Sequence, residues 1–199
     1  MPLDMAVALA GFAFAMSISP GPGNFLLLAS GANFGFRRSL PLMLGISGGF
    51  LAMVFGVGIG LGQLLERHPQ VYDGMRLLGA AYVLWMAWRL ARSRGLESSS
   101  GDVAVPIGFV QAALLQLVNP KAWAVALIVT VTYTVPADFL TSLALLIVIF
   151  AVVNLPALSV WVLSGAALRQ VLAKGRRIVV FNIAMALLLV ASMAPVLLR

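Results

Sequence analysis

The sequence contains no cysteine, a single histidine and only six acidic residues in 199 positions. Without cysteine the chain can form no disulfide, no thiolate metal site and no thiol nucleophile. The histidine, His68, has no second metal ligand at a suitable spacing, so we expect neither a metal site nor a resident cofactor. No nucleotide-binding motif is present, and any energy that the protein uses is therefore expected to come from ion gradients.

Charged residues are also scarce, at 10% of the chain, whereas hydrophobic residues make up 62%. Together with a mean hydropathy of +1.05, this balance excludes an ordinary soluble domain, whose surface needs more polar groups. We therefore predict an integral membrane protein that contacts the lipid bilayer. The formal net charge of +7 does not indicate a nucleic-acid partner, because the arginines occur in short clusters without interleaved aromatic residues.

The apolar residues fall into runs that are long enough to cross a membrane, which takes about 20 helical residues. Six spans are predicted, at about 5–32, 41–65, 74–91, 107–133, 139–165 and 178–198. The fold class is thus an all-α membrane protein with one transmembrane domain over residues 1–199. A polar linker at about 93–106 separates two halves of three spans each, at about 1–92 and 107–199. Pro41 is expected in the first turn of the second span, where its missing N–H costs nothing.

Lysine and arginine are concentrated on one side of this topology. The loops after the first, third and fifth spans carry nine of the thirteen basic residues, and the opposite side carries three. Because basic loops stay in the cytoplasm, the linker is predicted to be cytoplasmic. Both termini are then expected on the outer side of the membrane.

Two of the predicted spans contain helix-breaking sequences. Residues 19–24 read Ser-Pro-Gly-Pro-Gly-Asn, and residues 119–121 read Asn-Pro-Lys. Proline removes a backbone donor and glycine tolerates unusual conformations, so spans one and four are predicted to be broken. Broken backbone persists in hydrocarbon only where other helices or a cavity satisfy its polar groups. The two breaks therefore predict a shared cavity near the bilayer midplane.

The breaks also divide the chain into similar halves, since Pro22 and Pro120 lie about 100 residues apart. Three spans per half is an odd number, which requires the second half to enter the membrane from the opposite face. This arrangement is typical of a 3+3 inverted-topology repeat, in which broken helices from both halves point at the substrate.

The candidate substrate-binding residues are those of the two breaks and the polar or kinking positions in spans two and five. They are Pro20, Gly21, Pro22, Gly23, Asn24, Ser47, Asn119, Pro120, Lys121, Asn154 and Pro156. An asparagine amide presents donors and acceptors, so Asn24 and Asn119 suit a zwitterion. Each is equally suited to cap the half-helix that begins beside it. The half-helix N-termini themselves carry partial positive charge that favours a carboxylate.

The candidates in spans two and five carry less specific signals. Asn154 and Pro156 favour a structural kink over a substrate contact, although both stay on the candidate list. Ser47 is a candidate for the lining of the same cavity. Glycines four residues apart, such as Gly45 with Gly49 and Gly56 with Gly60, are expected to let helices pack closely in lipid.

Lys121 is the only charged residue deep in a long apolar run, because Asp4 and Asp138 lie at span ends. One hypothesis is that its ammonium pairs with a substrate carboxylate. Since a cavity of low dielectric disfavours the charged form of a lysine, the hypothesis extends to loss of the proton during transport. The alternative is that Lys121 reaches an interface or permanently satisfies nearby carbonyl groups.

Further short motifs accompany the breaks: Gly35-Phe36-Arg37-Arg38, Gly45-Ile46-Ser47-Gly48-Gly49 and Gly79-Ala80-Ala81-Tyr82-Val83-Leu84-Trp85. In their order and spacing, these motifs and the two breaks resemble the LysE/RhtB family of amino-acid exporters from about residue 10 to the end. The branch to which the chain is most similar exports cysteine and O-acetylserine. The resemblance implies proton-driven export of a small amino acid or derivative from a bacterial cytoplasm, across an inner membrane with both termini on its periplasmic side. The chain departs from the commoner family form in its extra glycine, Gly23, and in having no acidic residue deep in a span.

The exporter interpretation has alternatives of other classes. The first alternative is a passive channel, which would contain similar breaks. The second is a structural subunit of a membrane complex. An enzyme is not expected, because Ser17 and Ser19 have no histidine or acid at their depth to activate them. A homodimer is kept as a hypothesis, since six short spans enclose little space.

Overall fold

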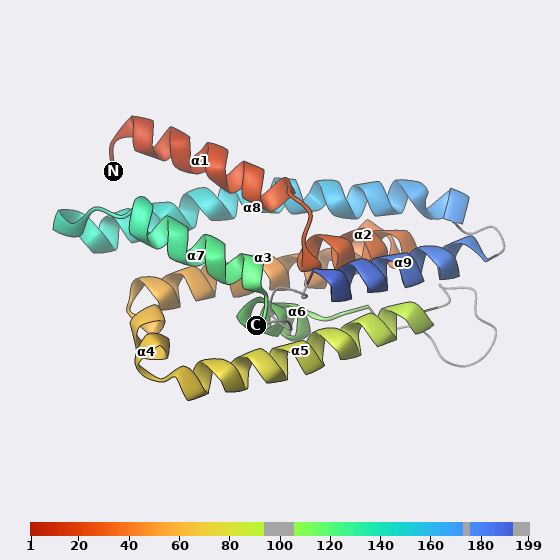
Figure 1. Cartoon of the computed structure of the whole chain (residues 1–199). Coiled ribbons are helices and arrows are strands. Elements are labelled where there is room, and N and C mark those ends of the chain that lie inside the picture. Colours follow the sequence, from red (N-terminus) through yellow and green to blue (C-terminus); the bar gives the residue numbers. More distant parts are fainter. Residues whose placement is uncertain (94–105, 173–175, 193–199) are drawn as a thin grey trace.

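The structure is a computed structural model that describes residues 1–93, 106–172 and 176–192. In these ranges it contains helices and no strands, as the sequence predicts. The elements are α1 (Leu3–Ile18), α2 (Pro22–Phe34), α3 (Phe36–Gly58), α4 (Leu61–Arg67), α5 (Pro69–Arg92), α6 (Phe109–Leu117), α7 (Pro120–Thr132), the 3-10 helix η1 (Pro136–Asp138), α8 (Phe139–Leu172) and α9 (Arg177–Ala191). Most of them run along one common direction (Figure 1). Of the predicted linker at 93–106, only the two end residues are described, and residues 193–198 of the sixth predicted span also lie outside the described residues.

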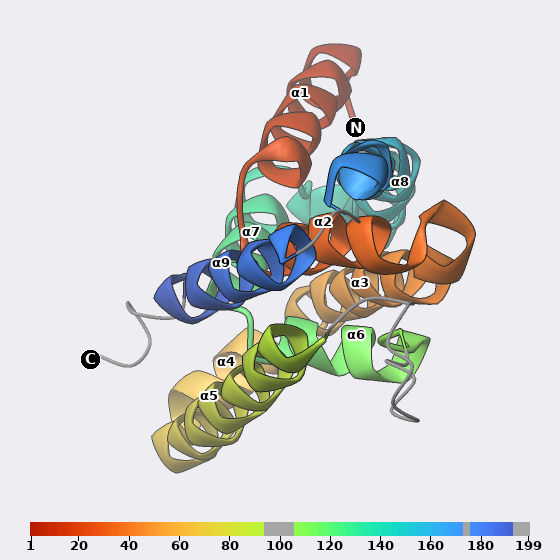
Figure 2. The same cartoon turned by 90° about the vertical axis from the view of Figure 1, so that its right-hand side faces the viewer.

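Both predicted helix breaks are present. Helices α1 and α2 meet at 58° across residues 19–21, and α6 and α7 meet at 69° across residues 118–119. A proline begins the second helix of each pair, where its missing N–H needs no partner. Seen from the end of the bundle, α2 and α3 lie between α1 and α8 on one side and α5 and α6 on the other (Figure 2).

The count of six spans is not confirmed. Among the described residues, α3 and α8 are long and apolar enough to cross a membrane, and the two bent pairs bring the number to four. Helix α9 is shorter, with 15 residues. Helix α5 has 24 residues but does not meet the same measure of length and hydropathy.

The predicted boundaries of the second span are wrong at both ends. Its helix begins at Phe36, and Pro41 lies inside it, because Gly35 with φ of 77° makes the turn from α2. The helix ends at Gly58, and Gly60 with φ of 112° separates it from α4. Among the described residues, no atom lies within 4 Å of the position that a Cβ atom on Gly60 would take. The expected close helix packing through Gly56 and Gly60 is therefore also wrong.

Close packing through other glycines is confirmed. A Cβ atom on Gly45 or Gly49 would collide with α6, at Phe109 and Ala113 respectively. The same holds where α2 crosses α8, because a Cβ atom on Gly31 would overlap the carbonyl group of Val162. Bare backbone therefore allows the closest helix approaches in the bundle.

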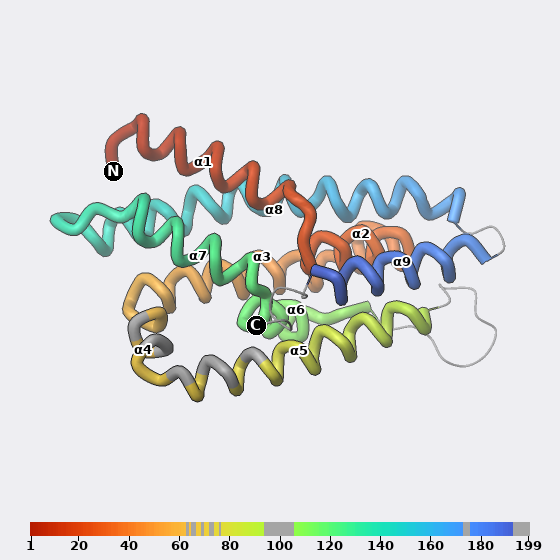
Figure 3. Tube along the Cα trace, in the orientation of Figure 1, coloured from red at the N-terminus to blue at the C-terminus, as the bar shows by residue number. Residues whose placement is uncertain are grey.

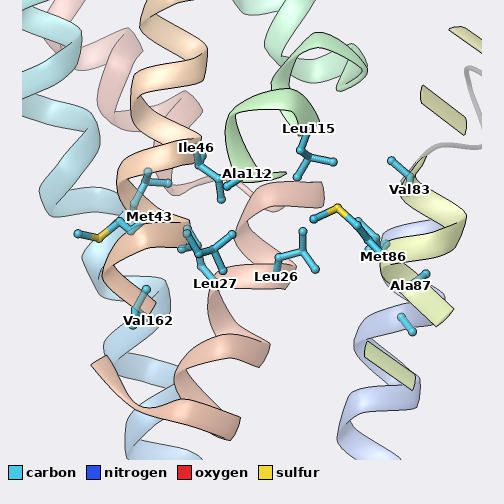
Figure 4. Close-up of a cluster of buried hydrophobic side chains, with 14 residues drawn as sticks. Leu26, Leu27, Met43, Ile46, Val83, Met86, Ala87, Ala112, Leu115 and Val162 are labelled. Atoms are coloured by element: carbon cyan, nitrogen blue, oxygen red, sulfur yellow. The ribbon is translucent and has the colours of Figure 1, made fainter. Parts of the chain in front are cut away.

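Two clusters of buried hydrophobic side chains lie on either side of the breaks. The first joins α2, α3, α5, α6, α8 and α9, and includes Leu26, Leu27, Met43 and Met86 (Figure 4). The second joins α1, α3, α7 and α8 around Phe150. The break region, where backbone polar groups are freed, thus lies between two apolar cores.

Candidate functional site

A cavity lies where the two breaks face each other. It provides about 70 Å³ of room for water-sized groups and is lined by parts of α1, α2, α3, α6, α7 and α8. Seven of the eleven predicted site residues line it: Gly21, Pro22, Gly23, Asn24, Asn119, Lys121 and Asn154. The two sequence segments that predicted a shared cavity are therefore in contact in the fold.

The other four predicted residues lie around this cavity rather than on its wall. The carbonyl oxygen of Pro20 accepts a hydrogen bond from the cavity lysine. Ser47 lies behind the wall, where its hydroxyl accepts a hydrogen bond of 3.2 Å from Asn154 Nδ2. Pro120 is the first residue of α7, and Pro156 is exposed on the surface of α8.

The Lys121 side chain connects the two breaks. Its Nζ donates hydrogen bonds to the Ser19 carbonyl at 2.7 Å, to Ser19 Oγ at 2.8 Å and to the Pro20 carbonyl at 3.4 Å. These three bonds match the three protons of an ammonium group. In this conformation Lys121 satisfies carbonyl groups freed by the first break, as one of the two sequence hypotheses states.

Asn24 and Asn119 have different structural roles. Asn24 Nδ2 donates to the carbonyl groups of Ser17 at 2.9 Å and Ser19 at 2.7 Å. It therefore caps the end of α1, and not the helix α2 that begins beside it. Asn119 does cap the following helix, because its Oδ1 accepts a hydrogen bond of 3.1 Å from the backbone N–H of Lys121.

As a result, the N-terminus of α2 is open. Gly21 supplies no capping side chain, and the first backbone N–H bond of this turn runs from Phe25 to the Gly21 carbonyl at 3.0 Å. Within the described residues, the N–H groups of Gly23 and Asn24 donate no hydrogen bond. Because both residues line the cavity, the positive end of the α2 dipole lies beside it.

The Lys121 ammonium lies close to this helix end. A Cβ atom on Gly21 would be 3.4 Å from Lys121 Nζ and 3.0 Å from its Cδ. The absence of a side chain at Gly21 thus leaves room for the lysine between the two half-helices. One side of the cavity thus carries the partial positive charge of a helix N-terminus and the full charge of an ammonium group.

Another wall of the cavity is apolar, and the sequence analysis did not predict it. Ile46, Phe50, Phe150 and Leu158 line the cavity from α3 and α8. Gln116, which also lines the cavity and accepts from Asn119 Nδ2 at 3.4 Å, was missed as well. As a polar residue in an apolar run near the second break, Gln116 carried a sequence signal, whereas the apolar residues carried none.

A second group of buried polar side chains lies away from the cavity. Asn33 Nδ2 donates to Asn182 Oδ1 at 2.7 Å, and Asn182 Nδ2 donates back to Asn33 Oδ1 at 3.0 Å. Asn182 Nδ2 also donates to the Ser93 carbonyl at 2.8 Å. This group fastens α2, α9 and the end of α5 to one another.

Comparison with known proteins places the chain among membrane exporters. The family model described as LysE type translocator matches residues 14–198. The cysteine/O-acetylserine efflux proteins of Escherichia coli (strain K12) and Shigella sonnei (strain Ss046) are each 33% identical over 177 residues, which cover 87% of this chain and 88% of the relative. That of Escherichia coli O139:H28 is 32% identical with the same coverage. No solved structure matches the chain.

Proposed function

Because the chain belongs to the LysE family of translocators, we propose that it exports a small neutral amino acid or amino-acid derivative from the bacterial cytoplasm, driven by the proton gradient. The relatives named as cysteine/O-acetylserine efflux proteins support this substrate class. The observation that carries the proposal is the cavity between two broken helices, with Lys121 and the open N-terminus of α2 on one side.

In the proposed binding mode, the substrate carboxylate lies at the N–H groups of Gly23 and Asn24. Lys121 Nζ then exchanges its bonds to the first break for a bond to this carboxylate. The substrate ammonium meets Asn24 Oδ1, which accepts no hydrogen bond among the described residues. Asn119 supports the arrangement by fixing the first turn of α7, on which Lys121 stands.

The size of the cavity supports a small substrate. Its room of about 70 Å³ corresponds to about two water molecules at roughly 30 Å³ each. In this conformation the cavity therefore favours a compact substrate over a bulky one. A larger substrate would require the walls to move apart.

Helix contacts support a 3+3 inverted repeat. Helix α1 packs on α8 as α6 packs on α3, and α2 packs on α8 as α7 packs on α3. Two further contacts, α3 with α8 and α5 with α9, join helices that correspond to each other in the two halves. The contacts of α2 with α3 and with α9 have no counterpart of similar extent among the described residues, so the two halves match each other in part, as an approximate pseudo-twofold relation would give.

The distribution of arginine supports the proposed orientation. The α2–α3 turn, the end of α5, the end of α8 and the start of α9 lie at one end of the molecule (Figure 3). Seven arginines of the described residues belong to this end: Arg37, Arg38, Arg89, Arg92, Arg169, Arg176 and Arg177. We assign this end to the cytoplasm and the end with the N-terminus to the periplasm.

Lys121 is the proposed site of proton coupling. It is the charged residue that lines the cavity, whereas Asp4 and Asp138 lie in the first turn of α1 and in η1. Loss of its proton would remove the charge that holds the carboxylate and would release the substrate.

The test is uptake of radiolabelled amino acids into inverted membrane vesicles with and without an imposed pH gradient. We expect one small amino acid to accumulate against its gradient with the native chain, and uptake by Lys121→Met to fall at least tenfold. Lys121→Arg tests coupling, because arginine keeps the charge but does not release its proton. Arg169→Gln, an exposed change on α8, is the matched control that keeps full activity.

Three results would contradict the proposal. Full activity of Lys121→Met would remove both roles of the lysine. Flux that neither saturates nor depends on the gradient would favour a passive channel. No accumulation across a broad panel of amino acids would leave a structural subunit as the remaining interpretation.

A further inference from the structure

The apolar wall of the cavity contains a pair of aromatic rings. Phe50 of α3 and Phe150 of α8 both line the cavity, and their ring centroids are 5.2 Å apart at an interplanar angle of 51°. From this geometry we propose that the Phe50–Phe150 pair forms the subsite for the substrate side chain. The pair limits it to short and uncharged groups. This inference rests on the proposed export function.

The wall is held in place by what lies behind it. Phe150 is 1% exposed and packs in the second hydrophobic cluster with Leu143 and Leu146, which are 2% and 0% exposed. Phe50, at 8% exposure, belongs to the same cluster. Because protein interiors are close-packed, these rings cannot retreat to admit a longer side chain without moving α3 or α8.

The chemistry of the wall selects against charge. Ile46 and Leu158 extend the apolar surface on either side of the rings. The one polar side chain that α3 and α8 contribute to the cavity is Asn154, whose Nδ2 is already bonded to Ser47. A lysine or arginine side chain placed here would lose its hydration and would share the cavity with the like charge of Lys121, which is strongly unfavourable.

The rings lie apart from the polar side of the cavity, so the charged groups of a substrate and its side chain are bound at different places. The carboxylate and ammonium groups are assigned to the polar side, at the N-terminus of α2 and Asn24. The cavity provides about 70 Å³ of room for water-sized groups, and these common groups and the α-carbon use most of it. Room for only a few side-chain atoms then remains beside Phe50 and Phe150.

The experiment measures competition by a homologous series against the labelled substrate in inverted vesicles. The series is alanine, 2-aminobutyrate, norvaline and norleucine, which differ by single methylene groups. For the native chain we expect competition to weaken at least tenfold where the side chain outgrows the subsite, since one methylene in a fitted pocket is worth about 10–200-fold. In Phe150→Leu and Phe50→Leu this limit should move by one or two methylene groups toward longer chains.

Leu189→Ala is the matched control. Leu189 of α9 is 0% exposed, belongs to the first hydrophobic cluster and not to the one behind the rings, and is not among the residues that line the cavity. Its substitution loosens a core of the bundle without freeing space behind Phe50 or Phe150, and we expect the original size limit to remain. Because two separate variants change the wall, failure of one to accumulate in the membrane leaves the other as the test. The rise in unfolding temperature on ligand binding gives a second readout that needs no transport.

An unchanged size limit in both phenylalanine variants would overturn the inference while leaving export established. It would also be overturned if Leu189→Ala shifted the limit equally. An equal gain in flux for every amino acid would show that the rings act as a gate and not as a subsite. If the native chain accumulates no amino acid, the export function itself is wrong.

Discussion

The crossing of α2 and α8 through Gly31 and Gly165 gives the sharpest stability prediction. A Cβ atom on Gly31 would overlap the carbonyl of Val162, and one on Gly165 would overlap the carbonyl of Leu28. Neither obstacle is a flexible side chain, so an alanine at either position must push the two helices apart by roughly 1 Å. Gly165→Ala is therefore expected to disturb the whole contact between α2 and α8.

Such overpacking costs about 1–3 kcal/mol of unfolding free energy. For a chain of this length, the unfolding midpoint falls by roughly 2–4 °C per kcal/mol, which tryptophan fluorescence during heating in detergent can resolve. Gly11→Ala is the control, because a Cβ atom on this α1 glycine would meet nothing within 4 Å. Alanine is the better helix former, so this variant should be neutral or more stable by up to about 1 kcal/mol.

The double variant Gly31→Ala/Gly165→Ala tests the mechanism. Once one methyl group has separated the helices, the second meets less resistance, so the combined loss should be smaller than the sum of the two single losses. A midpoint for Gly165→Ala equal to that of the native chain would refute the reasoning. An equal loss in Gly11→Ala would show that any alanine in these helices is harmful, and would refute it too.

Three further predictions concern polar contacts. Asn33→Leu should lower the unfolding free energy by about 1–3 kcal/mol because it leaves the buried Asn182 amide without its partner, and Asn33→Leu/Asn182→Leu should recover part of this loss in the same heating experiment. Asn119→Ala should cost about 0.5–2 kcal/mol through loss of the α7 cap, with no loss as the contradicting result. Gly21→Ala should reduce vesicle uptake with little change in stability, since its methyl group would displace Lys121 while its extended backbone suits alanine; unchanged uptake would contradict the assigned position of the lysine.

The sequence predicted those features of the fold that depend on local rules. The breaks at residues 19–24 and 119–121 follow from proline and glycine in otherwise apolar runs, and both are present. The start of α3 was wrong because Pro41 is compatible with more than one position in a helix, while the turn is made at Gly35. Capping of the helix that begins beside it was one of the two interpretations of Asn24, the other being a substrate contact, and the structure shows that its amide bonds to α1 instead of capping α2.

The residues that line the cavity also divide into those with a local sequence signal and those without one. Polar residues such as Lys121 and Asn154 are unusual in apolar spans, so their chemistry alone marked them as candidates. Phe50 and Phe150 are not unusual in a chain with 11 phenylalanines. Their selection depends on how α3 and α8 cross, which is a contact between distant parts of the sequence and has no local signal.

The interlocking of the two halves constrains how the protein is made. The partner of α1 and the main partner of α2 is α8, and the main partner of α5 is α9, so the first half completes little of its packing by itself. When only residues 1–92 have been synthesised, the Ser19 carbonyl already has its bond from Asn24, but the Pro20 carbonyl lacks the lysine that later binds it. Until Lys121 arrives, the break between α1 and α2 thus keeps an open carbonyl group, which is costly in the bilayer.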